Sequence, residues 1–348
     1  MNAVVLEQQG KMGAVAEIVA ARNDFTETAP PSAGEALVRT EASALNHMDL
    51  WVGMGVPGLD LTYPRVSGCD GCGIVESVGE GVDESWVGQR VIMNAALSIP
   101  QKPRHTDPPG STLAPEYELI GEHHFGTHRE TFTAPVAQLR PVGDADPKAA
   151  AAFGLVSLTA WGMIRKAGLH PGQRVLITGI GGGVSTAALA ICTWMGCPVI
   201  VTSRHEWKLE KAKQLGADEG ILDDGSDWSK PVRAWSHKRG VDVAIDSVGA
   251  PTHLGCVKSL ARGGAFVTCG ATAGPRAETD LGRVFWNQLR LLGSTMGSNE
   301  EFGEIVALFR SGALAPVIDS VHPWTDAKDA WARLEAADQF GKIVLDWS

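Results

Sequence analysis

The clearest chemical pattern in the chain is a cluster of glycines within residues 174–204, RVLITGIGGGVSTAALAICTWMGCPVIVTSR. Gly179, Gly182 and Ser185 fit the pattern G-x-x-G-x-x-S, whereas a strict G-x-G-x-x-G from Gly179 would need glycine in place of Val184. Glycines let the main chain turn sharply and bring its N–H groups close to a phosphate, and a following helix directs its positive end at the same phosphate. Because apolar runs flank the cluster, the stretch predicts a strand–turn–helix–strand unit that binds a dinucleotide through its pyrophosphate.

Two other interpretations of this stretch remain open. Glycine clusters also occur in turns that bind nothing, and the absence of charge from Val175 to Ser203 fits a membrane span. The glycines and Pro198 inside the stretch argue against a helix exposed to lipid, so we expect no membrane association.

The far end of the unit indicates which nicotinamide cofactor binds. Folds that prefer NAD place an acidic residue about 20 residues past the loop, where it binds the ribose 2′-OH. Here the strand ends in Ser203 and Arg204, which suit a 2′-phosphate, with no acid before Glu206 and with Lys208 one helical turn on. We therefore predict NADPH rather than NADH; the alternative is a solvated helix start with Ser203 as its N-cap.

Composition limits the class of protein. The 348 residues carry a net charge of −10, which disfavours a nucleic-acid partner because a phosphate backbone needs a basic face. The length predicts two domains, and the first residues, MNAVVLEQQGKMG, lack the apolar stretch of a signal peptide. Most of the six cysteines fall in predicted core patterns, so we expect reduced thiols and a cytoplasmic protein.

The elements that must position the chemical groups differ between the two parts of the chain. The N-terminal part is rich in β patterns and contains a long irregular segment, residues 94–125, with many Pro and His residues. Strands are predicted at 2–6, 14–19, 35–42 and 130–135, with two more within 67–82 and a short helix starting at Asn46.

From residue 147 onward helices and strands alternate. Helices are predicted at 147–167, 184–195, 206–215, 228–239 and 252–260, and strands at 175–177, 198–202, 219–222, 241–245, 265–269 and 289–294. Such repeats with short connections imply a parallel sheet covered on both faces, which binds ligands at the carboxyl ends of its strands. A helix from 302, a strand at 317–320, a helix at 326–337 and a strand at 342–346 complete the chain.

The whole chain resembles the medium-chain dehydrogenase/reductase superfamily. The matching motifs, in order, are ALNHMDLW, GCDGCGIVESVGEGV, LTAW, GIGGGVS, KAKQLGAD, AIDSVG, ARGGAFVTCG, LLGSTMGS and FGKIV. The resemblance implies an α/β protein with a GroES-like β-barrel catalytic domain, residues 1–143 and 303–348. It also implies a Rossmann domain with a doubly wound parallel sheet, residues 144–302, a cleft between the two and hydride transfer with NAD(P).

The resemblance also implies roles for individual residues, with Asn46 and Thr159 beside the nicotinamide. The other implied cofactor contacts are Gly179, Gly182, Gly183, Val184, Ser203, Arg204, Lys208, Ser247, Gly270, Ala271, Thr295, Met296 and Lys342. Two further candidates for catalysis are Asp49, as a proton relay, and Tyr63, as a hydrogen-bond donor to the substrate. Asp49 could equally cap a helix and Tyr63 could be a core aromatic residue, so no general acid is assigned.

The residues at the family's zinc positions favour an enzyme without a metal. Asn46, Cys69 and Leu155 stand where zinc alcohol dehydrogenases of this superfamily have Cys, His and Cys, and only Cys69 is a soft donor. A less favoured alternative combines Cys69 with the nearby His47, Asp49 and Asp70.

Other apparent metal or redox groups have simpler explanations. Residues 94–125 occupy the place of the family's structural zinc lobe but contain no cysteine. The histidines in and beside this segment match no standard zinc spacing, so we expect solvated loop residues: His105, His123, His124 and His128. Cys69 and Cys72 form a lone C-x-x-C, which we interpret as small-residue packing rather than as a redox pair.

These features together predict a zinc-free reductase of the quinone oxidoreductase type, although Asp223 stands where that branch often has Tyr. Without a Lewis acid to activate an alcohol, the expected substrate is a small quinone, an enone or another conjugated carbonyl. The alternatives are a zinc-type alcohol dehydrogenase with altered ligands and a non-enzymatic NADPH-binding protein. The apolar strand near Leu291–Ser298 predicts a homodimer, because an exposed edge strand needs cover.

Overall fold

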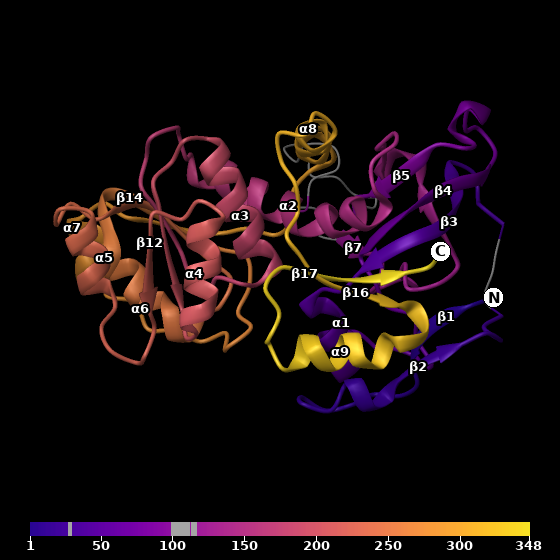
Figure 1. Cartoon of the computed structure of the whole chain (residues 1–348), viewed down its shortest axis with the longest axis horizontal. Coiled ribbons are helices and arrows are strands. Elements are labelled where there is room, and N and C mark those ends of the chain that lie inside the picture. Colours follow the sequence, from indigo (N-terminus) through magenta and orange to yellow (C-terminus); the bar gives the residue numbers. More distant parts are fainter. Residues whose placement is uncertain (27–29, 99–111, 113–116) are drawn as a thin grey trace. The chain divides into compact units, whose positions relative to one another are not determined.

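The computed structural model describes residues 1–26, 30–98, 112 and 117–348. The contacts between residues divide the chain into two compact units, coloured along the sequence in Figure 1. Unit 1 comprises Met1–Leu155, Ser298–Gly312 and Ile318–Ser348, and unit 2 comprises Val156–Gly297 and Ala313–Val317. The first division falls inside helix α2 (Pro147–Ala167), whereas the sequence analysis set it before that helix. In the described part of the chain, no helix is long and apolar enough to cross a membrane.

Unit 2 is built on a parallel sheet of six strands. In spatial order these are β12 (Glu219–Leu222), β11 (Val199–Ser203), β10 (Val175–Ile177), β13 (Val241–Asp246), β14 (Leu260–Thr268) and β15 (Arg290–Gly293). The chain enters at β10, proceeds outward to β12 and returns to β13 beside β10, so the direction of winding reverses between β10 and β13. This is the predicted doubly wound fold, in which ligands bind at the point of reversal.

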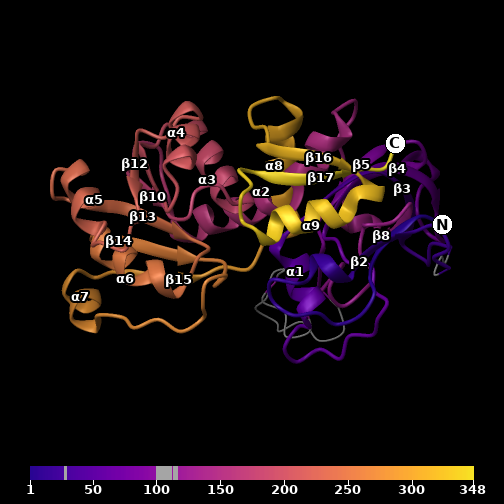
Figure 2. The same cartoon turned by 60° about the horizontal axis from the view of Figure 1, so that its bottom comes forward.

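Helices cover both faces of this sheet (Figures 1 and 2). One face carries α3 (Gly183–Trp194) and α4 (Glu206–Gln214), and the other carries α5 (Ser229–Trp235) and α6 (Ala250–Ser259). Helix α7 (Leu281–Trp286) follows near the edge strand β15. Apolar side chains of β10, β11, β13 and β14 fill the space beneath the helices, as predicted by their near-continuous apolar sequences.

Unit 1 contains a mixed sheet of seven described strands. Its path is β16 (Ile318–Pro323), β17 (Lys342–Asp346), β3 (Glu35–Ala44), β4 (Asp70–Val78), β5 (Arg90–Met93) and β9 (Leu139–Pro141), with β8 (Thr131–Pro135) also paired to β3. Two shorter pairs are β1 (Ala3–Leu6) with β2 (Val19–Arg22), and β6 (Ala96–Ser98) with β7 (Tyr117–Leu119). Helices α1 (His47–Met54), α8 (Asn299–Arg310) and α9 (Ala327–Glu335) belong to the same unit.

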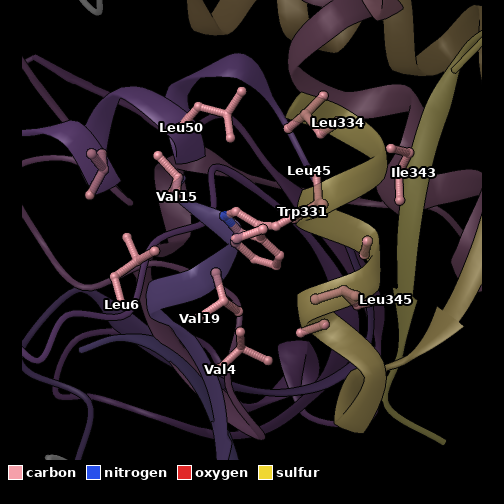
Figure 3. Close-up of a cluster of buried hydrophobic side chains, with 14 residues drawn as sticks. Val4, Leu6, Val15, Val19, Leu45, Leu50, Trp331, Leu334, Ile343 and Leu345 are labelled. Carbon is pink, nitrogen blue, oxygen red and sulfur yellow. The ribbon is translucent and has the colours of Figure 1, made fainter. Parts of the chain in front are cut away.

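The core of unit 1 joins the two ends of the chain. Trp331 projects from α9 into a cluster of apolar side chains from β1, β2, α1 and β17 (Figure 3). Val4, Leu6 and Val19 approach the indole from the N-terminal strands, and Ile343 and Leu345 belong to the last strand. The C-terminal residues therefore belong to the same unit and the same core as the first strands.

Several local predictions were wrong. The two strands expected within 67–82 are one strand, β4 (Asp70–Val78). Residues 14–19 form no strand: Val15 and Ala16 donate their main-chain N–H groups to the Glu335 carboxylate, a partner far along the chain, and the strand starts only at Val19. Helix α5 ends at Trp235 because His237 and Lys238 adopt left-handed φ angles of 53° and 65°.

Helix α7 was not predicted, and neither were the short strands β5, β6, β7 and β9. The helix starts where the Asp280 carboxylate accepts the main-chain N–H of Arg283, a cap of the first turn.

Candidate active site

The glycine loop lies between β10 and α3. Gly179 and Gly181 have φ angles of 60° and 118°, so both occupy the left-handed region in which glycine carries no steric cost. Helix α3 has Gly182 as its N-cap and no side-chain cap bond, which leaves its first N–H groups facing the loop. Ser185, at the place of a third glycine, donates its hydroxyl to the carbonyls of Gly179 and Gly182 at 3.2 and 3.0 Å and so closes the loop.

Three loops at the carboxyl ends of neighbouring strands pack against one another. A Cβ added to Gly179 would lie 2.6 Å from Val248 Cγ2, and one added to Gly249 would lie 2.9 Å from Ala271 Cα. The Thr272 hydroxyl donates to the carbonyl of Ser247 at 3.2 Å. The predicted cofactor residues Gly179, Gly182, Gly183, Val184, Ser247, Gly270 and Ala271 therefore lie at the same edge of the sheet.

Thr295 and Met296 follow β15 and continue this edge. Met296 has a φ of 44°, and its carbonyl lies 2.3 Å from the place that a Cβ on Gly162 would occupy, so α2 and this segment are in close contact. Thr159 is buried one turn before Gly162 on α2. Unit 2 thus brings these residues to its own surface loops and to the helix that packs against them.

Asp246 is a buried carboxylate at the point where the winding reverses, and the sequence analysis named only its neighbour Ser247. Its Oδ1 accepts the hydroxyls of Thr178 and Thr252 at 2.5 and 2.6 Å, and its Oδ2 accepts the N–H of Gly249 at 2.9 Å. Asp246 therefore ties the loop after β10 to the loop after β13. The motif AIDSVG contained the signal, since an acid at the end of an apolar strand is unusual.

The end of β11 carries the residues predicted to choose the cofactor. Arg204 is exposed, whereas Ser203 is buried and its Oγ accepts the main-chain N–H of His205, so Ser203 is not the N-cap of α4. Lys208 is 7 % exposed and folds back onto the glycine loop. A Cβ on Gly181 would lie 2.9 Å from Lys208 Cδ and 3.4 Å from its Nζ.

Unit 1 assembles a buried polar cluster from distant segments. The Lys342 ammonium donates to the carbonyl of Leu45 and to Asn46 Oδ1, both at 2.6 Å, and to Asp70 Oδ2 at 2.9 Å. Asn46 Nδ2 donates to the same Asp70 oxygen at 2.9 Å. The other Asp70 oxygen accepts the main-chain N–H of Leu155 on α2 at 2.7 Å.

A second buried chain starts at Asp49 on α1. Asp49 accepts the N–H of Asn46 at 2.7 Å and lies 3.2 Å from His128 Nε2, while His128 Nδ1 lies 2.9 Å from the Ser43 hydroxyl. Trp347 donates its indole N–H to that hydroxyl. Burial opposes ionisation of Asp49, but His128 and the hydrogen bonds outweigh it and hold the pKa of Asp49 below its usual value.

The prediction of solvated histidines was therefore wrong for His128, which is fully buried and stacks edge-on against Trp331 at 5.1 Å. His123 is half-buried and accepts the N–H of Leu119, and His124 is exposed beside Glu118. His105 lies outside the described residues. His128 was missed because its partner Asp49 is distant in sequence and no local spacing connects them.

The remaining candidates in unit 1 are Tyr63 and the pair Cys69 and Cys72. Tyr63 donates its hydroxyl to the carbonyl of Val52 at 2.6 Å and packs against the core around Trp331. Cys69 and Cys72 are fully buried free thiols. Burial, reinforced by Asp49 and Asp70, raises the pKa of Cys69 well above its usual value, and burial also raises the pKa of Cys72.

The donor set in unit 1 does not fit a catalytic zinc. Zinc needs three nitrogen, sulfur or carboxylate ligands and an open position. Asn46 Oδ1 and Asp70 already bind Lys342, Leu155 has an apolar side chain, and Cys69 is the only soft donor among these positions. Within the described residues, no group of three His, Cys, Asp or Glu side chains could hold a metal ion.

Comparisons with known proteins agree with this architecture. Residues 32–144 match the model of the alcohol dehydrogenase GroES-like domain, and residues 183–311 match that of the zinc-binding dehydrogenases. The zinc-type alcohol dehydrogenase-like protein YogA of Leptosphaeria maculans is 30% identical over 335 residues, which cover 91% of each chain. Crotonyl-CoA reductase of Streptomyces avermitilis is 27% identical over 85% of this chain and 75% of that protein. A crystal structure of an NAD-dependent alcohol dehydrogenase is 37% identical, covers 100% of both chains and superposes with a TM-score of 0.92.

Proposed function

Because the chain belongs to the medium-chain dehydrogenase/reductase superfamily of nicotinamide-dependent oxidoreductases, we propose that it reduces a quinone, an enone or another conjugated carbonyl with NADPH and without a metal. This proposal rests mainly on the side chains of unit 1 that would have to bind a metal, because they are already bonded to Lys342. An ammonium, rather than an open coordination position, faces Asn46 and Asp70. An alcohol dehydrogenase of the zinc type would need a Lewis acid there to polarise its alcohol.

The loops of unit 2 suit a dinucleotide. Gly179 and Gly181 leave the loop free of side chains, and the N-terminus of α3 presents N–H groups to a pyrophosphate. When bound, the cofactor supplies the hydride, while the protein supplies orientation and exclusion of water. Asp246 fixes the loops on either side of this position through its hydrogen bonds to Thr178 and Gly249.

Three groups favour NADPH over NADH. Arg204 is exposed at the end of β11, Ser203 precedes it, and Lys208 lies against the glycine loop, so two cationic residues lie at the position where a 2′-phosphate would bind. No carboxylate stands at the end of β11 to bind a free 2′-OH. The similar structure described as NAD-dependent makes NADH the alternative, and the two cofactors are to be compared directly.

The substrate class follows from the same reasoning. A conjugated carbonyl accepts hydride without a Lewis acid, because its electron-poor carbon is already activated. One relative is named as a reductase of crotonyl-CoA, a conjugated thioester, which supports an acceptor of this type.

The test is a panel of acceptors with the purified protein. We expect NADPH oxidation, followed by its near-ultraviolet absorbance, with quinones and enones but not with simple ketones, and no loss of activity after treatment with a chelator. Metal analysis of the same sample is the control. One zinc ion per chain, together with oxidation of simple alcohols, would establish the zinc-type alternative instead.

We also propose that the protein forms a homodimer through the edge of unit 2. Leu281, Phe285 and Trp286 of α7 are 72, 72 and 68 % exposed, and β15 is an edge strand of the described sheet. Such an apolar edge is stabilised when a second copy covers it. Sedimentation should give a dimer, and Phe285→Glu should shift it toward monomer.

A further inference from the structure

Lys342 is a lysine enclosed in an oxygen cage. Its side chain is 3 % exposed, and the ammonium donates to the carbonyl of Leu45, to Asn46 Oδ1 and to Asp70 Oδ2 at 2.6–2.9 Å. An ammonium has three hydrogens to donate, so these oxygens use all of them. The side chain has no donor left for a phosphate unless one of these bonds breaks.

The cage fixes both ends of the Asn46 amide. Its oxygen accepts from Lys342, and its nitrogen donates to Asp70 Oδ2 at 2.9 Å, so the orientation of the amide is determined by the two charged partners. Asp70 is in turn held by the N–H of Leu155, and a Cβ on Gly154 would lie 2.6 Å from Asp70 Oδ1. Gly154 therefore permits the carboxylate to reach the main chain of α2.

We propose that Lys342 is an internal cation: its ammonium takes the place of a bound metal ion among these oxygens and positions Asn46, so Lys342 is a positioning residue and not a ligand of the cofactor phosphates. The inference rests on the proposed metal-independent function. A buried ion pair contributes little net stability compared with well-packed apolar residues, so its presence is better explained by the geometry it imposes. Asn46 is the residue that the sequence resemblance places beside the nicotinamide.

The test uses Lys342→Met and the double variant Lys342→Met/Asp70→Leu, with Lys148→Met as the matched control. Lys148 forms a half-exposed pair with Asp346 at 3.0 Å, at the other end of the same strand β17. Lys342→Met leaves Asp70 buried without its cation and should lower the unfolding midpoint by roughly 6–20 °C. The double variant removes both charges and should recover most of this loss.

Measurements of kcat and of NADPH affinity distinguish a positioning role of Lys342 from a purely structural one. In the double variant we expect kcat to fall by about tenfold or more, while the dissociation constant for NADPH, from fluorescence titration, changes by less than about threefold. Lys148→Met should change neither. A double variant that recovers both stability and kcat would make the pair purely structural and overturn the proposal.

A tenfold weaker NADPH affinity with unchanged kcat would also overturn it, since Lys342 would then be a cofactor ligand. Metal analysis of the wild-type protein is independent of these measurements on the variants. Zinc bound at one ion per chain would refute the proposed function, whereas the stability and affinity measurements need no substrate and test Lys342 directly.

Discussion

The two units hold their buried carboxylates in different ways. In unit 2, Asp246 is held by two hydroxyl groups and a main-chain N–H, all in loops at one edge of the sheet. In unit 1, Asp70 is paired with the Lys342 ammonium and Asp49 with the His128 imidazole. The donors to Asp246 are neutral, whereas the Lys342 ammonium compensates the charge of Asp70 within the cluster. The carboxylate of unit 2 therefore orders neighbouring loops, and that of unit 1 keeps one fixed arrangement of polar groups.

The largest expected effect concerns the Asp49–His128 pair. His128→Phe keeps a ring against Trp331 but leaves the Asp49 carboxylate buried without its partner, so we expect a loss of about 3–5 kcal/mol in the free energy of unfolding. Urea denaturation measures it. His124→Phe, in the same segment but exposed, should change stability by less than about 1 kcal/mol. Equal effects of the two substitutions would show that the buried position beside Asp49 adds nothing to the contribution of His128.

A smaller effect is expected at Asp246. Asp246→Asn replaces one of the two accepting carboxylate oxygens with an NH2 group, so the three bonds from Thr178, Thr252 and Gly249 are no longer all accepted. The loops should loosen as a result, with a dissociation constant for NADPH about tenfold higher and a stability loss of about 1–3 kcal/mol. The control is Asp242→Asn: Asp242 accepts the N–H of Arg174 at the amino end of the same strand. It should cost stability but leave NADPH affinity unchanged. Unchanged affinity in Asp246→Asn would mean that the carboxylate serves the fold alone.

Cofactor choice gives a third, more specific effect. Arg204→Gln should weaken NADPH binding by about tenfold, or about 1.4 kcal/mol, and leave NADH binding unchanged, because only the 2′-phosphate loses a partner. Arg262→Gln, an exposed arginine near the amino end of β14, is the control. Equal losses for both cofactors would assign Arg204 to a part of the dinucleotide that they share.

The smallest effect is the acid dependence of stability. The folded pKa of Asp49 lies below its usual value of 3.8, so the unfolded chain takes up this proton first as the pH falls. The stability from this group is fully present above the unfolded pKa and is lost as the pH falls through the folded pKa. Urea midpoints between pH 6 and pH 3 should fall less steeply in Asp49→Asn than in the wild type. An unchanged slope would show that Asp49 has no depressed pKa.

Much of the fold was predictable from periodic patterns. Near-continuous apolar runs identified the buried strands of unit 2, and the bounds of α2, β12 and β17 agree with the sequence analysis. The strand predicted at 14–19 does not form before Val19, because the Glu335 carboxylate, from the other end of the chain, accepts the main-chain N–H groups of Val15 and Ala16. A local pattern contains no information about such a partner.

The sequence by itself determined the superfamily, the parallel sheet and the glycine loop, because these depend on residues close together in the chain and on glycine conformations that few other residues adopt. Only the tertiary structure decided what surrounds Asn46. It brought Leu45, Asp70, Leu155 and Lys342 together around one amide, and it placed His128 in the interior beside Asp49. The physical reason is that a buried charge must find its counter-charge in space, and the strands that supply one are neighbours in the sheet but not in the sequence.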